Sequence, residues 1–521
     1  MPYTSFLPEF SVLAAAFLIL LRVIVAPKRI SADFPILFLG LLVSTGFALF
    51  PVMNPFEAVS WDTMLSADKF SGLFRLFIAV AALLAVSYSK DYFKDKGILG
   101  PEIPFLFLGA TFGLMLMASA TNFLMLIVAL ETASLAMYVL AAAARKERIS
   151  IEAGIKFFLN SAFATAVMIW GISILFGLAG SLDYADIKSN FLRFQNVEIK
   201  PFPMLGILAL VVGLGFKITL FPFHLWAPDV YQGSPTPFTL FLATASKTAG
   251  IAALLRIFDG PLHYLFGDLQ GLIWILAAFT MVAASTTALW QVDAKRLLAY
   301  SSISHAGFMV MGIAAKGSLP SGEAMTSTVF YIAPYVLATA GAFTVLCYLE
   351  RKRGETSLKV FNGLWKTDPM MTFTMVIFLA SLAGLPPTLG FLGKYLLFVD
   401  AYEAGLRWLL GAAILSTVVS LFFYFSIIRC MLLNEPPEKT EEKPFCLNDI
   451  GPIVLLVACA AFAISGFGAV ALVLAGLFVV WGVIVLRGPR FFLLGISAVL
   501  LGAIFFWDPI YALCVEAIKG L

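Results

Sequence analysis

Four ionisable residues stand inside otherwise apolar stretches of the chain. Glu131 lies in NFLMLIVALETASLAMYVLAA, Lys217 follows VVGLGF, Lys247 is central in FTLFLATASKTAGIAALL, and Lys394 follows the proline pair of GLPPTLGFLGKYLLF. A charged side chain near the centre of a bilayer costs about 2.5 to 3.5 kcal/mol on insertion scales. Burial disfavours the charged form of such a group and a nearby opposite charge favours it, so groups of this kind can exchange protons near neutral pH. The pattern predicts a proton relay.

Two structural explanations compete with the relay. Each residue could be one half of a structural ion pair, or the long stem of a lysine could carry its ammonium out to the lipid headgroups. Either explanation suits a single residue. Four such residues at similar depth would cost on the order of 10 kcal/mol without return, and this favours the relay.

The composition places these residues in a membrane. The chain has 521 residues, of which 61% are hydrophobic and 12% charged, with a mean hydropathy of +0.96. Short polar loops interrupt it at regular intervals, which indicates an all-α polytopic membrane protein. The longest polar stretches are too short to form a soluble domain. The expected apolar segments are 6–26, 34–52, 70–89, 102–120, 122–143, 155–179, 203–220, 236–258, 270–292, 297–315, 326–349, 370–398 and 405–432.

The basic residues between these segments predict the orientation. Most of them follow odd-numbered segments, for example Lys90–Lys96, Arg145–Arg148 and Arg351–Lys359. By the positive-inside rule these loops are cytoplasmic and the N-terminus lies outside the cytoplasm. The stretch Leu7–Val25 lacks a basic region before it, so we interpret it as a retained span and not as a cleaved signal peptide.

Prolines interrupt two of the segments beside a lysine. Pro222 follows Lys217, and Pro386–Pro387 precede Lys394. Proline removes a backbone donor and frees carbonyls that only a polar, protein-lined cavity can satisfy within a membrane. The seventh and twelfth segments are therefore predicted to be broken helices. Their odd spacing predicts two inverted five-helix repeats, segments four to eight and nine to thirteen.

Other polar residues are weaker candidates. His224 and His305 could pass protons between the lysines because imidazole titrates near neutrality, but each could equally be a hydrogen-bonded core histidine. Lys295 could belong to the relay or anchor a helix end at the cytoplasmic surface. Asp229 is expected to cap the turn that opens the eighth segment.

The sequence offers no redox centre. The cysteines lie scattered without a ligand spacing and are expected to be small core residues. Three histidines do not suit paired haem ligation. No GxGxxG sequence follows a strand, so neither a nucleotide nor a metal site is expected in this chain.

Three blocks carry a resemblance to a known family. FKITLFPFHLWAPDVYQGSPTP, KRLLAYSSISHAGFMVMG and GLPPTLGFLGKYLLF resemble the antiporter-like membrane subunits of respiratory complex I. Within that group, PFHLWAPDVYQGSPTP is more similar to the subunit N family of bacterial NADH:quinone oxidoreductase, the counterpart of mitochondrial ND-two, than to subunits L and M. The resemblance covers roughly residues 100 to 430. It implies two inverted five-helix half-channels and proton translocation.

The resemblance also implies roles for single residues. The family's fifth-helix glutamate and seventh-helix lysine, which form a pair, correspond to Glu131 and Lys217. The lysines of its eighth and twelfth helices correspond to Lys247 and Lys394. His224, His305 and Lys295 are candidates along the connecting axis.

The implied assembly supplies what this chain lacks. NADH, FMN, iron–sulfur clusters and quinone are expected in other subunits, and the expected partners are membrane subunits, antiporter-like paralogues among them, and the bilayer of the bacterial inner membrane, with no nucleic acid. Two alternatives remain: a subunit of a multi-subunit cation/proton antiporter or of a membrane-bound hydrogenase, which share these blocks, or a purely structural subunit.

The predicted organisation has four parts. Residues 1–101 form helices one to three, 102–258 the first repeat, 270–432 the second repeat, and 450–521 the C-terminal helices, for 14 or more spans in total. A last helix is expected from Phe491. The apolar tract Pro452–Leu486 is expected to form either an extra hairpin or one long helix.

Overall fold

The computed structural model of the chain describes residues 5–26, 32–53, 58–193, 201–318, 323–436 and 489–519. It is mainly helical, as predicted. In the first half the helices are α1 (Leu7–Val25), α2 (Asp33–Met53), α3 (Lys69–Val86), α4 (Ser89–Asp95), α5 (Glu102–Ser119), α6 (Phe123–Ala141), α7 (Arg148–Ala179), α8 (Tyr184–Arg193), α9 (Pro201–Lys217), α10 (Trp226–Gly233), α11 (Thr236–Phe241) and α12 (Lys247–Asp259). In the second half they are α13 (Phe266–Ala288), α14 (Ala294–Ala315), α15 (Glu323–Arg353), α16 (Leu364–Thr367), α17 (Pro369–Ala383), α18 (Leu389–Glu403), α19 (Arg407–Leu433), α22 (Pro489–Gly502) and α23 (Trp507–Lys519).

The described helices fit a multi-pass membrane protein. Among them, 11 are long and apolar enough to cross a membrane, or up to 12 if the bent pair α22 and α23 counts as one span. Helices α9 and α17 are apolar but shorter. The count of 14 or more spans therefore stays a prediction.

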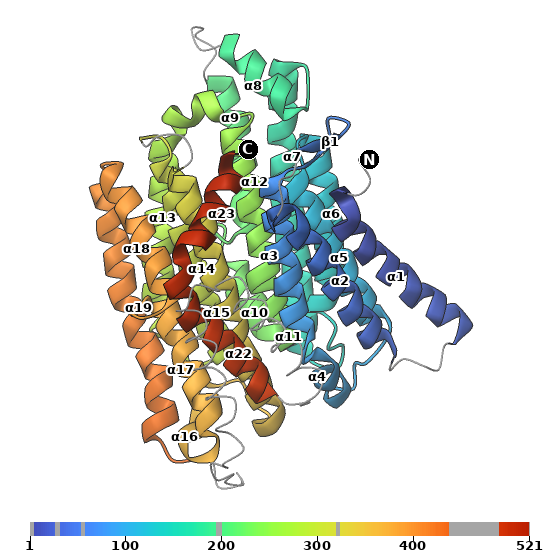
Figure 1. The fold of residues 1–521 in the computed structure, drawn as a ribbon, viewed down its shortest axis with the longest axis vertical. Coiled ribbons are helices and arrows are strands. Elements are labelled where there is room, and N and C mark those ends of the chain that lie inside the picture. The colour runs from blue at the N-terminus through green and yellow to red at the C-terminus, as the bar shows by residue number, and fades with distance from the viewer. Residues whose placement is uncertain are drawn as a thin grey trace.

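The helices divide into a buried centre and an apolar periphery. Within an apolar stretch of 18 residues, all residues of the span Thr236–Asp259 and 94% of those of α14 are buried. In α1, α2 and α19 only 33% of the residues of such a stretch are buried. In Figure 1, α1 and α2 lie at one side of the molecule and α18 and α19 at the other, with α12 and α15 between them. The exposed apolar side chains of the outer helices suit lipid contact. Because these helices flank the centre, they separate its polar residues from the bilayer.

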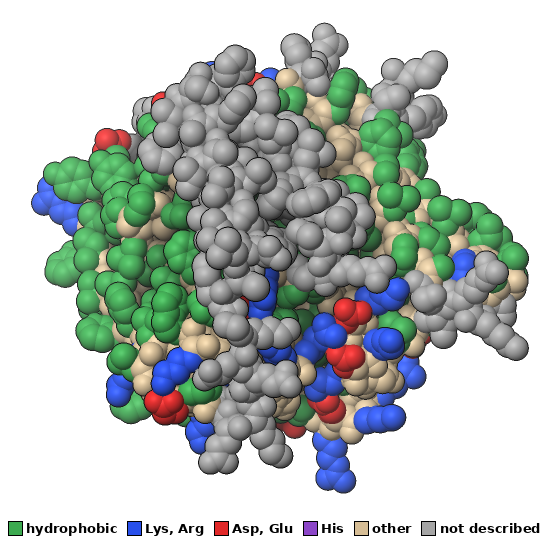
Figure 2. Space-filling view, turned by 60° about the horizontal axis from the view of Figure 1, so that its bottom comes forward, with side chains coloured by type: hydrophobic (Ala, Val, Ile, Leu, Met, Phe, Trp, Pro, Cys, Tyr) green, Lys and Arg blue, Asp and Glu red, His purple; other side chains and the backbone are tan. Residues whose placement is uncertain are grey.

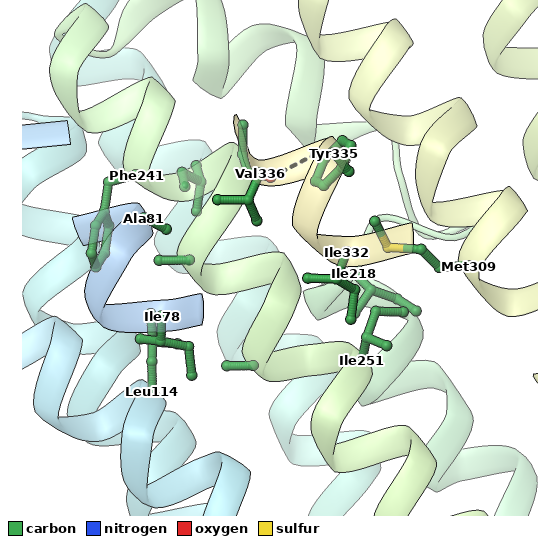
Figure 3. Close-up of a cluster of buried hydrophobic side chains, with 14 of the residues drawn as sticks. Ile78, Ala81, Leu114, Ile218, Phe241, Ile251, Met309, Ile332, Tyr335 and Val336 are labelled. Atoms are coloured by element: carbon green, nitrogen blue, oxygen red, sulfur yellow. Dashed lines mark hydrogen bonds between the residues drawn. The ribbon is translucent and has the colours of Figure 1, made fainter. Parts of the chain in front are cut away.

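A continuous apolar core joins the central helices. Figure 3 shows Ile78 of α3, Leu114 of α5, Ile251 of α12 and Ile332 of α15 in one cluster, and all of these side chains are fully buried. The Tyr335 hydroxyl in this cluster donates to the Ala243 carbonyl oxygen at 2.7 Å. The core fixes α12, α14 and α15 relative to one another.

Buried ion pairs hold the N-terminal helices to the rest. The Arg256 guanidinium of α12 binds the Asp68 carboxylate at the start of α3 through two hydrogen bonds of 2.9 and 3.0 Å. Burial alone would raise the pKa of Asp68, but Arg256 outweighs it and holds that pKa below its ordinary value. Arg75 and Glu9 form a second buried pair, 2.6 Å apart. The first pair joins α12 to the start of α3, and the second joins α3 to the first turn of α1.

A small β-hairpin accompanies the helices. Strands β1 (Val59–Trp61) and β2 (Leu65–Ala67) pair antiparallel between α2 and α3. The Thr121 amide donates to the Met64 carbonyl oxygen at 3.0 Å, so the hairpin covers the junction of α5 and α6.

The C-terminal region differs from its prediction. The expected single helix from Phe491 consists of α22 and α23, separated by a 3₁₀ turn at Ala503–Phe506. Pro509 lies in the first turn of α23 and has no amide hydrogen, so an uninterrupted α-helix would lose a hydrogen bond there. The tract Pro452–Leu486 lies outside the described residues. Helix α1 begins and α23 ends at the same end of the molecule (Figure 1).

Two glycines of α5 allow a stability test. A Cβ atom at Gly113 would lie 2.5 Å from the Ala133 nitrogen and 2.8 Å from the Ala129 carbonyl oxygen of α6, whereas one at Gly109 would meet nothing within 4 Å. We expect Gly113→Ala to push α5 from α6 and to lower the free energy of unfolding by about 1–3 kcal/mol. Thermal unfolding of the purified complex in detergent measures this effect. Gly109→Ala is the control, and equal melting of the two variants would contradict the expectation.

Candidate functional site

Lys217 lies where α9 ends. It is the last residue of that helix and is 6% exposed, and its ammonium donates to the Ser134 hydroxyl of α6 at 3.1 Å. Residues 218–225 then form turns before α10 begins at Trp226. Pro222, which has no amide hydrogen to continue a helix, lies in this interruption.

Glu131 lies one turn before Ser134 on the same helix. Its carboxylate is half-buried and accepts a hydrogen bond of 2.9 Å from the Thr165 hydroxyl of α7. Glu131 and Lys217, which both belong to the described part of the chain, form no direct ion pair. The Lys217 ammonium therefore meets α6 at Ser134, one turn after Glu131.

Lys247 is the most enclosed of the three lysines. It is 1% exposed and follows a π-helical turn at Leu242–Ser246. Single π turns inside helices occur frequently at functional sites. Its ammonium donates to the Ser302 carbonyl oxygen at 2.5 Å and to the Ser302 hydroxyl at 2.6 Å. The Ser302 hydroxyl is also 2.7 Å from the Tyr335 hydroxyl, so the lysine begins a chain of hydroxyl groups.

Lys394 lies in the second turn of α18, after the interruption that separates this helix from α17. It is 3% exposed, and its ammonium donates to the carbonyl oxygen of Ala383, the last residue of α17, at 3.2 Å. Carbonyls at a helix C-terminus lack intrahelical partners and carry partial negative charge. The ammonium also lies 4.6 Å from the centre of the Phe308 ring, within the range of a cation–π contact.

His305 lies between these two lysines on α14. One ring nitrogen is 2.5 Å from the Tyr331 hydroxyl and the other 3.2 Å from the Tyr424 hydroxyl. Ser302, His305 and Phe308 follow one another at intervals of one helical turn, so they share a face of α14. This face connects the Lys247 contact with the Lys394 contact.

The remaining candidates are His224, which follows α9, and Lys295, at the start of α14. His224 is in the turn after α9, stacks on Phe221 with ring centres 5.6 Å apart, and its Nδ1 has no hydrogen-bond partner among the described residues. Lys295 is buried, with its ammonium 3.1 Å from the Ser234 carbonyl oxygen and 3.5 Å from the Glu350 carboxylate. This burial argues against an anchor in the lipid headgroups.

Asp229 does not cap a helix, contrary to prediction. It lies in the first turn of α10, and its carboxylate binds the Lys156 ammonium at 2.7 Å and the Arg296 guanidinium at 2.6 Å. Two cations from α7 and α14 compete for the carboxylate more effectively than a backbone amide does.

Sequence reasoning missed several polar residues of the centre. Tyr331, Tyr335 and Tyr424 supply hydroxyls around His305 and Ser302, and all three are nearly fully buried. The spacing of Tyr331 and Tyr335, one turn apart in α15, was the available signal. Glu350 was missed as well. Within the described residues no group of three side chains could hold a metal ion.

Comparison with known proteins identifies the family. A profile described as "NADH:quinone oxidoreductase/Mrp antiporter, TM" matches residues 120–420, more than half of the chain. The chain belongs to this family. Curated relatives are named NADH-quinone oxidoreductase subunit N: that of Paramagnetospirillum magneticum is 37% identical over 83% of this chain and 88% of its own length. That of Granulibacter bethesdensis is 36% identical over 84% and 91%.

Solved structures of the family have the same fold. A chain of respiratory complex I from Thermus thermophilus with bound aureothin is 29% identical, covers 97% of this chain and 98% of its own, and superposes with a TM-score of 0.73. A chain of the Mrp complex from Dietzia is 17% identical, with coverages of 100% and 98% and a TM-score of 0.80. This second likeness concerns the fold alone.

Proposed function

We propose that this chain is the subunit N type of proton-translocating membrane subunit in an NADH-quinone oxidoreductase, and that it couples electron transfer in other subunits to proton movement. The relatives at 36–37% identity support the assignment to that enzyme. The enzyme's NADH, FMN, iron–sulfur clusters and quinone would be held by partner subunits, and antiporter-like paralogues are further expected partners.

One observation carries the proton-translocating role: a single face of α14 joins two buried lysines. Ser302 contacts Lys247, His305 follows one turn later, and Phe308 contacts Lys394. Burying a lysine costs free energy, and none of these three lysines has a direct carboxylate partner to offset that cost. We propose the relay Glu131, Lys217, Lys247 and Lys394, with His305 between the last two and with His224 and Lys295 as accessory groups.

Unpaired polar atoms support a hydrated route. The hydroxyls of Ser246, beside Lys247, and of Ser381, two residues before the carbonyl that Lys394 contacts, have no partner among the described residues. The same holds for Nδ1 of His224. Buried polar atoms without protein partners are commonly satisfied by ordered water, and water between ionisable groups can conduct protons.

The proposed architecture is the inverted-repeat plan. Residues 102–258 and 270–432 would form two five-helix repeats within 14 or more spans, with α9–α10 and α17–α18 as the broken seventh and twelfth helices. Each interruption lies beside a lysine. The N-terminus would lie on the non-cytoplasmic side of the inner membrane, opposite the basic loops. A cation/proton antiporter or a hydrogenase remains the alternative, and a list of co-purifying subunits distinguishes them.

Replacing Glu131 with alanine tests the role. We expect proton pumping by the reconstituted complex to fall about tenfold, because loss of a neighbouring negative charge worth about 1.4 kcal/mol shifts a proton equilibrium by that factor. A pH-sensitive dye in liposomes measures pumping, and absorbance measures NADH oxidation. The control is Glu152→Ala, an exposed glutamate paired with Lys156. If turnover and protons pumped per electron both match wild type, Glu131 has no place in the relay.

A further inference from the structure

A cavity opens on the side of the molecule that carries the basic loops. Its volume is about 500 Å³, and it lies between the end of α4, the start of α14 and the end of α15. Glu147 and Glu355 at its rim are exposed, whereas Lys295 and Glu350 on its floor are buried. Figure 2 shows lysine, arginine and acidic side chains gathered at this end of the molecule. The cavity therefore links solvent to ionisable groups inside the protein.

The lining is richer in acid than in base. It contains the carboxylates of Glu147, Asp293, Glu350 and Glu355 and the ammonium groups of Lys96 and Lys295. An anionic ligand such as a phosphate or a lipid headgroup would meet net negative charge here. Water and protons fit the lining better.

Glu350 is the innermost carboxylate, 5% exposed, and four groups from other elements converge on it. The Tyr92 hydroxyl donates to it at 3.0 Å and the Thr236 hydroxyl donates to its other oxygen. The ammonium groups of Lys295 and Lys96 lie 3.5 and 3.6 Å away. On its own helix, Cys347 lies one turn earlier and Arg351 directly follows.

The Lys96 ammonium is held in its charged form. Burial lowers the pKa of Lys96, but its hydrogen bond to Glu147 and the charge of Glu350 outweigh this and raise that pKa above its ordinary value. Lys295 is the cation on the inner side, since it also donates to the Ser234 carbonyl oxygen. Glu350 therefore stands between an outer and an inner ammonium group.

Ser234 supplies an independent sign of water. It is 1% exposed and lines the cavity, and its hydroxyl has no hydrogen-bond partner among the described residues. A buried hydroxyl beside a cavity of this size is expected to bind ordered water.

The cavity floor is connected to the relay through α14. Lys295 and Ser302 are two helical turns apart on the same face of this helix, about 10 Å along its axis. Ser302 contacts the Lys247 ammonium. The Tyr231 hydroxyl of α10 lies beside Ser302 and adds a polar group on the way.

We propose that Glu350 is the proton-uptake group of this subunit, which loads Lys247 from water in the cavity. The inference rests on the proposed function. A hydronium ion gives its proton to the Glu350 carboxylate and leaves as water, and the neutral acid releases the Lys295 ammonium from its ion pair. The proton then passes along α14 to deprotonated Lys247, which restores the carboxylate and its pairing with Lys295.

The test compares variants of the whole complex in liposomes. Glu350→Gln keeps the size of the side chain but cannot carry a proton through, and we expect proton-coupled quinone reduction to fall at least about tenfold. Glu350→Asp should recover most of the rate. Ser234→Val should lower the rate severalfold, because it displaces water and leaves the pairing of Glu350 intact. Glu435→Gln, an exposed glutamate paired with Lys366, should match wild type.

The outcomes separate this inference from the proposed function. Wild-type pumping in both Glu350→Gln and Ser234→Val overturns it. A loss in Glu350→Gln that Glu350→Asp does not restore, with wild-type Ser234→Val, also overturns it in favour of a structural ion pair. If Glu350→Gln does not assemble, Glu350→Asp and Ser234→Val decide. Wild-type pumping after loss of the Lys247 ammonium would instead refute the relay itself.

Discussion

Replacing Lys247 with methionine is expected to lower NADH-driven quinone reduction and proton pumping by the reconstituted complex at least about tenfold. The Lys247 ammonium is buried and contacts both polar atoms of Ser302. Methionine fills a similar volume without a proton-carrying group, so packing is retained while the step between the α14 hydroxyls and His305 is lost. Turnover falls together with pumping because, in a coupled enzyme, electron transfer is no faster than the proton transfer to which it is coupled.

Lys316→Met is the matched control. Lys316 is another buried lysine, but it lies at the C-terminal end of α14, 11 residues beyond His305, and its ammonium pairs with Asp259 at 2.6 Å and donates to the Phe258 carbonyl oxygen at 2.9 Å. Its loss should cost about 1–3 kcal/mol of stability and leave the protons pumped per electron unchanged. NADH oxidation by a water-soluble acceptor reports assembly of each variant. A Lys247→Met complex that assembles and pumps normally would show that Lys247 carries no proton.

The strongest sequence signals were charges within apolar runs. Lys217, Lys247 and Lys394 were visible because each interrupts a stretch that has no other reason to be polar, and all three are buried in the structure. The prolines beside Lys217 and Lys394 likewise coincide with helix ends at Lys217 and Ala383. These features are local, so the sequence carries them without knowledge of the fold.

Features that depend on distant partners could not be predicted. Glu350 is followed by Arg351, Lys352 and Arg353 and therefore has the pattern of a residue at the membrane surface. It is buried because α4, α11 and α14 converge on it from elsewhere in the chain. Asp229 was assigned to a local cap for the same reason, since its partners Lys156 and Arg296 belong to α7 and α14. Local propensity predicts helices and breaks, but tertiary packing decides which polar groups meet.

Replacing Lys394 with methionine is expected to abolish most proton pumping as well, again at least about tenfold. Its ammonium is held by the free carbonyl of Ala383 and by the Phe308 ring, without a carboxylate partner. A neutral side chain there removes the last buried cation of the proposed relay, so a proton that reaches His305 has no acceptor. Exposed Lys366, paired with Glu435, gives the matched control Lys366→Met, for which wild-type pumping is expected. Equal pumping in the two variants would contradict the assignment.

Substitutions at two glycines test whether the position of the Lys394 side chain matters, and not only its presence. Gly384 and Gly405 have φ angles of +80° and +74°, so alanine at either site costs about 1–2 kcal/mol of backbone energy. Only at Gly384 would the new Cβ atom meet Lys394, 2.8 Å from its Cδ atom, since a Cβ atom at Gly405 meets nothing within 4 Å. Gly384→Ala should therefore displace the lysine from Ala383 and lower pumping more than Gly405→Ala, at similar loss of stability. Equal pumping would mean that the relay tolerates movement of the ammonium, and that the contact with the end of α17 has no part in holding the proton.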